Sequence, residues 1–264
     1  MFADYHTHSD SSFDSIAPME SMIQASIDMG MDHFCLTDHL EIDYRFSKLC
    51  YSLEPKAYNK YQEKVIAQFP WADVRKGIEL GLQPHLKNEM ARLLCGCNFD
   101  FIIASVHYIG NQDPYFPEFF DGMSSRDAYT AYLQELIACL SGFEEYSVVG
   151  HICYPSRFIP FEKKTMAYAD LADISDELLK MVIQSGHGIE VNTSSYATHN
   201  MPVPGFDYVR RYKELGGEII TIGSDAHRPE DMGRFFDQAL EGIKASGFRY
   251  LTAFKEMQPE FVKI

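Results

Sequence analysis

Seven short apolar runs alternate with seven amphipathic segments along this sequence. Several of the runs lack polar alternation, which is typical of strands buried on both faces of a parallel sheet. Strict alternation of strands and helices predicts an α/β fold with a parallel sheet. A first predicted strand ends within 4–9, and the others cover 33–37, 74–80, 99–106, 146–150, 188–191 and 218–222; the predicted helices cover 17–30, 55–69, 83–95, 124–140, 173–186, 204–215 and 232–246.

Polar side chains lie at or just beyond the ends of these predicted strands. His6 and His8 are two residues apart, so a strand would point both imidazoles to the same face. Chemistry at so many successive strand ends predicts a closed, TIM-like barrel whose C-terminal rim carries the functional site. The residues at these positions are His6, His8, Asp14, His39, Glu79, His107, His151, Asp225 and His227.

This set of imidazoles and carboxylates predicts a metal cluster. An isolated His-x-His pair would more often be solvated or simply packed, so the prediction depends on the convergence of all nine residues. Buried at such density, these groups would repel one another or lack partners unless cations held them together. Mixed nitrogen and oxygen ligands suit zinc, iron or manganese.

The charge balance of the chain is strongly acidic. Lys and Arg total 23 against 38 Asp and Glu, which gives a formal net charge of -15. Such a field repels a nucleic-acid backbone, whereas a small anionic substrate could still be held at bound metals. A nuclease would need a basic track beside the metals. The candidate basic residues are instead scattered along the chain as Lys60, Lys64, Arg75, Lys76, Lys163 and Lys164.

Length and composition favour one soluble domain. A single α/β barrel commonly reaches 264 residues, and no repeat or low-complexity linker divides the chain, so we expect one domain over residues 1–264. No apolar run approaches the length of a membrane span, and no signal peptide precedes the His-x-His strand. The six cysteines form no CxxC pair, and free thiols suit a reducing compartment. We therefore expect a cytoplasmic protein without a membrane partner.

Six short motifs carry the polar residues along the chain. In order they are Asp4-Tyr5-His6-Thr7-His8, Thr37-Asp38-His39, Gly77-Ile78-Glu79, Ser105-Val106-His107, Gly150-His151 and Gly223-Ser224-Asp225-Ala226-His227. Together they resemble the successive motifs of the polymerase and histidinol phosphatase (PHP) superfamily. The resemblance extends from residue 4 to about residue 233, which is nearly the whole chain.

The resemblance implies a distorted seven-stranded barrel with three divalent metal ions. Zinc is the first expectation for these ions, with manganese or iron as alternatives. The position of Asp14 is often a histidine in related proteins, and a carboxylate can still serve a zinc or manganese site. By this resemblance, His6, His8, Glu79 and Asp225 would hold one metal, Glu79, His107 and His151 a second with Glu79 bridging, and Asp14, His39 and His227 a third.

The implied activity is phosphomonoester hydrolysis, with Glu79, Asp225 and His227 as the expected catalytic residues. A hydroxide that bridges two metals has a lowered pKa and would attack the phosphoryl group in line, while the metals neutralise its charge. No covalent phosphoenzyme is needed. The leaving alkoxide would take its proton from a metal-bound water or from a carboxylic acid near Asp225.

Within the superfamily, the chain most resembles the histidinol-phosphate phosphatase branch. The resemblance is carried by Ser105-Val106-His107-Tyr108, the long loop after it, and Glu190-Val191-Asn192-Thr193-Ser194. It implies a small phosphorylated metabolite as substrate, namely L-histidinol phosphate of histidine biosynthesis. The loop over 108–123 is long enough to cover a substrate. Arg157 resembles an arginine that grips the substrate phosphate, although it could instead form an ion pair, and further substrate contacts are expected from Tyr108, Asn192 and His199.

One departure from the branch keeps other substrates open. Relatives of this type follow Asn-Thr-Ser with a glycine and soon afterwards an arginine, whereas this chain has Ser195-Tyr196-Ala197-Thr198-His199. Arg228 could replace the missing arginine or could cap the following helix. The alternatives are therefore a phosphoesterase for another small phosphate, such as a nucleotide or sugar phosphate, and a non-catalytic metal-stabilised module. The latter predicts degenerate ligands and a larger chain, and this sequence shows neither.

Overall fold

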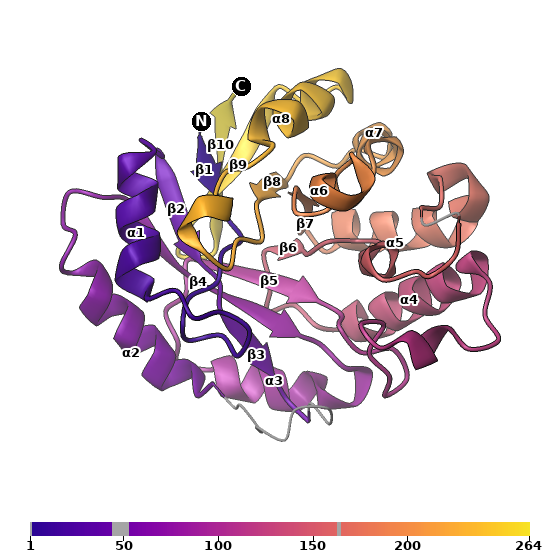
Figure 1. The fold of residues 1–264 in the computed structure, drawn as a ribbon, viewed down its shortest axis with the longest axis horizontal. Coiled ribbons are helices and arrows are strands. Elements are labelled where there is room, and N and C mark those ends of the chain that lie inside the picture. Colours follow the sequence, from indigo (N-terminus) through magenta and orange to yellow (C-terminus); the bar gives the residue numbers. More distant parts are fainter. Residues whose placement is uncertain (1, 44–52, 163–164) are drawn as a thin grey trace.

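Parallel strands form the central sheet of the protein (Figure 1). The structure is a computed structural model that describes residues 2–43, 53–162 and 165–264. The strands are β1 (Ala3–Asp4), β2 (His33–Leu36), β3 (His39–Glu41), β4 (Val74–Gly81), β5 (Phe101–Ser105), β6 (Val148–Val149), β7 (Gly188–Asn192) and β8 (Ile220–Gly223). They pair in the order β1-β2-β4-β5-β6-β7-β8, with β3 also on β4, and every pair is parallel.

The second strand position is divided between β2 and β3. Phe34 lies opposite Val74, and His39 lies opposite Glu79, so the two short strands pair with successive halves of β4. The prediction of a loop over 40–54 is wrong for residues 40 and 41, because these belong to β3 and continue the sheet. Residues 44–52 of that loop, like Lys163 and Lys164, lie outside the described residues.

Backbone hydrogen bonds between β1 and β8 close the sheet into a barrel. The Tyr5 N–H donates to the Ile222 carbonyl at 3.1 Å, and the Asp225 N–H donates to the His6 carbonyl at 2.8 Å. β1 and β6 are each two residues long, so the barrel is irregular. The predicted α/β fold, a distorted TIM-like barrel, is confirmed, and the carboxyl ends of the strands meet at one rim.

In the described part of the chain, seven helices of eight or more residues surround the barrel (Figure 1). Each corresponds to a predicted helix with ends shifted by a few residues. The Ser124 side chain and Asp127 form a capping box that begins the fourth of these helices. The seven are α1 (Met19–Asp28), α2 (Pro55–Ile66), α3 (Lys87–Leu94), α4 (Ser125–Leu140), α5 (Ala172–Gln184), α7 (Phe206–Glu214) and α8 (Phe236–Ala245). Shorter pieces are α6 (Tyr196–His199) and the 3-10 helices η1 (Pro84–Leu86), η2 (Pro117–Phe120), η3 (Tyr154–Arg157), η4 (Tyr168–Leu171) and η5 (Pro229–Asp231).

A C-terminal hairpin follows α8, whereas 218–222 was predicted as the last strand. It consists of β9 (Tyr250–Lys255) and the antiparallel β10 (Gln258–Lys263). The Phe254 ring packs on Phe101 at 5.1 Å between centroids, and the Phe254 N–H donates to the Tyr5 hydroxyl at 2.9 Å. The Ile220 N–H, at the start of β8, donates to the Thr252 hydroxyl. The hairpin therefore fills the amino-terminal end of the barrel, opposite the rim that carries the polar residues.

We expect Phe254→Ala to lower the free energy of unfolding by about 3–5 kcal/mol, because it leaves a cavity at the base of the barrel. Phe254 is 2% exposed, whereas Phe261 on β10 is 49% exposed. Phe261→Ala is thus the matched control, with an expected loss below about 1 kcal/mol. Urea denaturation of both variants measures the difference. An equal decrease in the free energy of unfolding of both variants would contradict the role assigned to Phe254.

Over the residues that the structure covers, no helix combines the length and the apolar character needed to span a membrane.

Candidate metal centre

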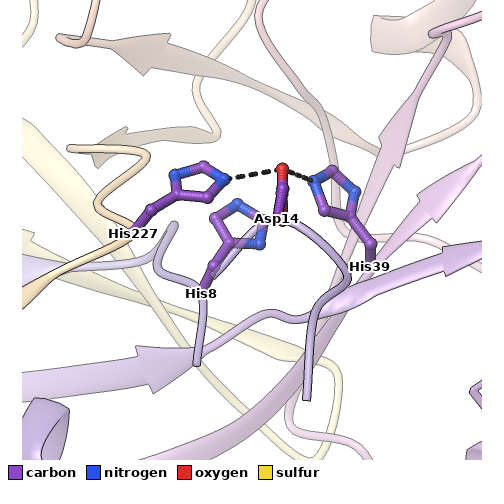
Figure 2. A group of neighbouring side chains, drawn as sticks. All are labelled: His8, Asp14, His39 and His227. Atoms are coloured by element: carbon purple, nitrogen blue, oxygen red, sulfur yellow. Dashed lines mark hydrogen bonds and ion pairs between the residues drawn. The ribbon is translucent and has the colours of Figure 1, made fainter. Parts of the chain in front are cut away.

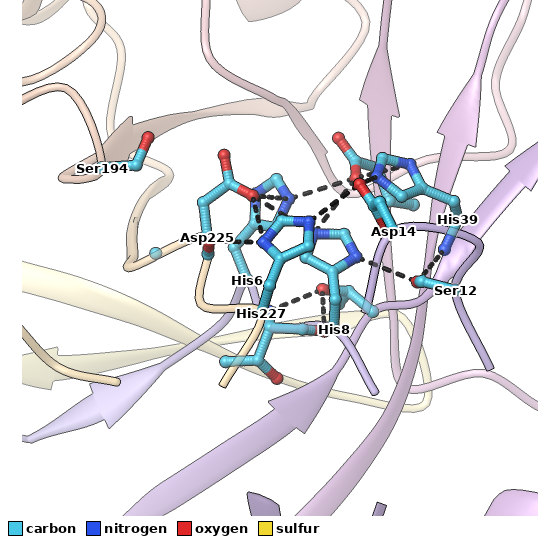
Figure 3. Close-up of polar contacts among 12 residues, drawn as sticks. His6, His8, Ser12, Asp14, His39, Ser194, Asp225 and His227 are labelled. Carbon is cyan, nitrogen blue, oxygen red and sulfur yellow. Dashed lines mark hydrogen bonds and ion pairs between the residues drawn. The ribbon is translucent and has the colours of Figure 1, made fainter. Parts of the chain in front are cut away.

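All nine predicted ligands lie together at the carboxyl rim of the barrel. Figure 3 labels His6, His8, Asp14, His39, Asp225 and His227 among them. Seven of them are at least nine-tenths buried, whereas the side chains of Asp14 and His227 are 33% and 30% exposed. The strands position the set because each residue stands at or just after a strand end. The set consists of His6 and His8 after β1, Asp14 in the next loop, His39 at the start of β3, Glu79 in β4, His107 after β5, His151 after β6, and Asp225 and His227 after β8.

The four residues predicted to hold the first metal converge in the structure. The Nε2 atom of His6 lies 3.2 Å from Glu79 Oε2 and 3.7 Å from Asp225 Oδ1. The Nε2 atom of His8 lies 3.3 Å from Asp225 Oδ1 and 3.6 Å from Glu79 Oε2. Two imidazole nitrogens and two carboxylate oxygens thus face a common point.

The second predicted group uses the other oxygen of Glu79. Glu79 Oε1 lies 2.9 Å from His151 Nε2 and 3.5 Å from His107 Nε2, and these two nitrogens are 3.4 Å apart. The Ser105 hydroxyl donates to the same oxygen at 2.6 Å. Glu79 therefore presents one oxygen to each of two neighbouring groups, as the bridging prediction requires.

The third predicted group lies nearest to solvent (Figure 2). Asp14 Oδ2 is 2.9 Å from His227 Nε2 and 3.4 Å from His39 Nε2. The ring of His8 stacks between the rings of His39 and His227, at centroid distances of 4.4 and 4.2 Å. The carboxylate of Asp14 is thus in place where related proteins often carry a histidine.

Hydrogen bonds behind the cluster orient the imidazoles. The His8 Nδ1 atom bonds with the Ser12 hydroxyl at 3.2 Å, and that hydroxyl donates to Asp38 Oδ1 at 2.9 Å. The His39 backbone N–H donates to the same hydroxyl at 3.0 Å. This network leaves the Nε2 atom of His8 directed into the cluster, which is how outer partners orient metal ligands.

Two further carboxylates contact predicted ligands and were missed from the sequence. Glu41 Oε1 lies 2.7 Å from His107 Nδ1, and Glu190 Oε1 lies 2.6 Å from His6 Nδ1. Glu190 is the one charged residue in the predicted apolar strand 188–191. A charge in a strand buried on both faces was the available signal, because it needs a specific partner.

The cluster contains buried polar atoms that fit a metal. Among the described residues, the Nε2 atoms of His6 and His8, the Nδ1 atom of His39 and the Oε2 atom of Glu79 are buried without a hydrogen-bond partner. Leaving such atoms unpaired is costly, and nitrogen and oxygen donors at this spacing suit divalent cations. The residues present therefore fit a metal cluster.

Charge and burial set the protonation states within the cluster. Burial lowers the pKa of four imidazoles, but nearby carboxylates outweigh it and raise that of His107 to about 9 and those of His6, His39 and His227 above the ordinary value, so a bound cation would displace protons from them. Burial raises the pKa of Glu79, but the charge of His6 outweighs it and holds that pKa well below its usual range. Burial likewise raises the pKa of Asp225, and Arg157 overcomes this and keeps it well below the ordinary value. Burial lowers the pKa of His8 to about 3, so this imidazole stays neutral. Ionised carboxylates and neutral imidazoles are the ligating forms.

The cluster forms one wall of a cavity of about 410 Å³. The loop over 108–123, predicted to cover a substrate, contributes Asp113, Tyr115 and Phe116 to its lining. Glu41 and Arg157 add further charged groups. The other aromatic side chains that line it are Phe13, Tyr154 and Phe158.

Arg157 borders this cavity in a fixed orientation. Its Nη2 atom donates to Asp225 Oδ2 at 2.6 Å, to Ser194 Oγ at 2.8 Å and to Asn192 Oδ1 at 3.1 Å. The contact with Asp225 is the ion pair that the sequence left open as an alternative, and it is not a surface pair, because the Arg157 side chain is 19% exposed and that of Asp225 is 7% exposed. Asn192 is fully buried and contacts Arg157 without lining the cavity.

Two of the predicted substrate contacts lie away from the cavity. Tyr108 is 2% exposed and does not line it. His199 ends α6 and lines a different cavity, of about 430 Å³, together with Tyr129 and Cys153. The structure therefore does not bring Tyr108 and His199 to the lining of the cluster cavity, and their contacts with a substrate stay predictions. Arg228 precedes η5 with its side chain 73% exposed, and it does not border the cluster cavity either.

A PHP domain model matches residues 4–194 of the chain. The chain belongs to the PHP domain family. The match ends at Ser194, before Asp225 and His227. These two residues join the cluster in the structure because they follow β8, which lies beside β1 in the barrel.

Full-length relatives share this PHP fold. The histidinol-phosphatase of Lactococcus lactis is 29% identical over 257 residues, which cover 97% of this chain and 95% of that protein. A probable histidinol-phosphatase of Thermotoga maritima is 27% identical, with 94% of each chain covered. The crystal structure of histidinol phosphate phosphatase from Lactococcus lactis, complexed with zinc, L-histidinol and phosphate, matches with a TM-score of 0.88 at 28% identity over 98% of both chains. The putative histidinol phosphatase of Listeria monocytogenes has the same fold, with a TM-score of 0.77 at 18% identity, 89% of this chain and 99% of that one being covered.

Proposed function

We propose that this PHP protein hydrolyses L-histidinol phosphate to L-histidinol and phosphate, a reaction of histidine biosynthesis, in one domain over residues 1–264. The observation that carries the proposal is the complete ligand set beside a cavity that Arg157 borders. The full-length similarity to a histidinol phosphate phosphatase whose structure holds zinc, L-histidinol and phosphate supports the choice of substrate. The free thiols of Cys35, Cys139 and Cys153 suit the reducing cytoplasm in which we place the reaction.

The proposed cofactors are three divalent cations, with zinc first and manganese or iron as alternatives. When bound, such cations activate water and neutralise the negative charge of a phosphoryl group. Glu79, with one oxygen for each of two groups, would join two of the sites. All nine proposed ligands belong to groups of donor atoms close enough to hold a cation. Their division among the ions follows the resemblance to the PHP family, with His6, His8, Glu79 and Asp225 for the first ion, Glu79, His107 and His151 for the second, and Asp14, His39 and His227 for the third.

Arg157 is the proposed phosphate-binding residue. Three acceptors hold its Nη2 atom, whereas its Nη1 atom makes no hydrogen bond to the described residues. The guanidinium therefore has donors left for phosphate oxygens, which it binds well because of its planar geometry. Asp225 and His227 line the same cavity, so a carboxylate and an imidazole would stand against the reacting phosphate.

The remainder of the cavity suits the organic part of the proposed substrate. An aromatic ring such as imidazole can pack on Tyr115, Phe116 and Phe158. The carboxylates of Glu41 and Asp113 would favour a cationic amine. A cavity of about 410 Å³ has the size expected for a small metabolite.

A second candidate substrate class has one observation in its favour. Among the described residues that line the cavity, Arg157 is the one arginine, and the chain lacks the arginine expected soon after Ser194. Another small phosphate, such as a nucleotide or sugar phosphate, is therefore the alternative.

The decisive experiment is phosphate release by the zinc- or manganese-loaded protein. L-Histidinol phosphate is compared with nucleotide phosphates, sugar phosphates and an aryl phosphate. We expect kcat/KM for L-histidinol phosphate to exceed every other value by about 100-fold or more, because a site with fixed polar contacts strongly rejects substrates that leave them unpaired. Cleavage of the aryl phosphate without preference for L-histidinol phosphate would remove the proposed substrate and leave the phosphatase chemistry standing.

A further inference from the structure

Glu190 is a buried charged residue outside the nine predicted ligands. It lies in β7 and is 1% exposed, and it is not among the residues that line the cavity. A charge at such a position is costly unless hydrogen bonds satisfy both of its oxygens. Its role must therefore be read from the groups that it contacts.

The two oxygens of Glu190 contact ligands of two different metal groups. Oε1 lies 2.6 Å from the Nδ1 atom of His6, which belongs to the first group. Oε2 accepts the backbone N–H of His151, of the second group, at 2.8 Å and the side-chain amide of Asn192 at 3.3 Å. Because a carboxylate accepts, the proton of His6 belongs on Nδ1, and the lone pair of Nε2 is directed at Glu79 and the cluster.

The surrounding backbone leaves room for this carboxylate. A Cβ atom at Gly223 would collide with Glu190 Oε1 and with the Cβ atom of His6. Gly223 ends β8, and His6 follows β1, so the carboxylate lies where these two strands close the barrel. The glycine thus leaves room for a side chain of this length, and the two donors that face its oxygens favour a carboxylate there.

We propose that Glu190 is a positioning residue of the metal centre. Its carboxylate fixes the tautomer of His6 and accepts a hydrogen bond from the backbone N–H of His151. It therefore aligns ligands of two adjacent metal groups. This inference rests on the proposed metal centre, and it assigns Glu190 no contact with substrate.

The exchange Glu190→Gln tests the role with little change of shape. Glutamine offers one acceptor oxygen, whereas His6 Nδ1 and the His151 N–H each need an acceptor. We expect zinc affinity to fall about 10–100-fold, as is typical when an outer partner of a metal ligand is lost. Because Glu190 does not line the cavity, KM should stay within about twofold once zinc is saturating, and added zinc should restore much of kcat.

Competition titration of the full chain with a zinc-binding fluorescent chelator measures this affinity. The matched control is Glu214→Gln, which makes the same exchange at a residue with its side chain 54% exposed, and it should bind zinc as the unmodified protein does. A Glu190→Gln protein with unchanged zinc affinity would overturn the proposal. So would a loss of activity that excess zinc cannot rescue, because that result indicates a general structural defect.

A measurement on the unmodified protein covers the case in which the variant fails to fold. Long-range proton–nitrogen correlation spectra of the zinc-loaded protein should show His6 protonated at Nδ1, and protonation at Nε2 would overturn the proposal. Failure of the proposed function is recognised separately. If the unmodified protein binds no zinc in the titration, the metal centre itself is wrong; if it binds zinc but prefers another phosphate, Glu190 keeps its role.

Discussion

Glu79→Gln is expected to lower kcat/KM for phosphate release by about 1,000-fold or more, the largest effect of any single change considered. Glu79 is fully buried. Its Oε1 atom faces nitrogens of His107 and His151, and its Oε2 atom faces nitrogens of His6, His8 and His39. The glutamine amide keeps the shape but replaces one oxygen by an NH2 group, which cannot ligate a cation. Two of the proposed metal groups would therefore be affected together.

Metal content provides the independent measurement for this variant. Elemental analysis of the purified Glu79→Gln protein should find fewer zinc ions per chain than in the unmodified protein, while its circular dichroism spectrum stays the same. Glu214→Gln again serves as the control with full activity and metal content. Activity within tenfold of the unmodified protein would exclude Glu79 as a bridging ligand.

Arg157→Ala is expected to lower kcat/KM by about 100- to 1,000-fold, because it removes one partner of a buried charge pair. If the arginine bound only the ground-state phosphate, KM alone would rise. The Nη2 atom, however, also holds Asp225 Oδ2 at 2.6 Å, so the alanine variant leaves that carboxylate without its cation. We therefore expect kcat to fall as well as KM to rise.

Arg157→Lys separates the two contributions. A lysine keeps the charge but lacks the planar set of donors that reaches Asp225, Ser194 and a phosphate at the same time. Its kcat/KM should lie between those of the alanine variant and the unmodified protein. Steady-state kinetics with both constants resolved measures this. If neither kcat nor KM changes in the alanine variant, Arg157 has no place in the site.

The barrel and the gathering of the candidate ligands at its rim could be predicted from the sequence because both depend on local patterns. Apolar runs define the strands, and a residue such as Glu79 or His107 is assigned to the rim simply because a run ends there. The division of one strand position into β2 and β3 could not be predicted in this way. It depends on which half of β4 each segment meets, and that is a tertiary contact.

Residues whose roles depend on distant partners were also missed. Glu190 and His6 are 184 positions apart in the sequence, so their contact leaves no local pattern. The direction of a loop side chain also leaves no local pattern, so the sequence did not show that His199 lines the cavity of about 430 Å³ beside Tyr129. The hairpin of β9 and β10 was missed because the surface it covers, around Tyr5 and Phe101, exists only once the barrel has closed.

The hairpin of β9 and β10 closes the barrel at the end opposite the cluster cavity. Tyr5, Phe101 and Phe254 fill the barrel interior below the cluster, so no small molecule can pass through the base of the barrel. The exposed side chains of Tyr115 and Phe13 lie at the outer side of the cavity, so we expect the proposed substrate to enter and both products to leave past them. With the phosphate held at the cluster, the alcohol would leave first. We therefore expect inorganic phosphate to inhibit by competing with the substrate.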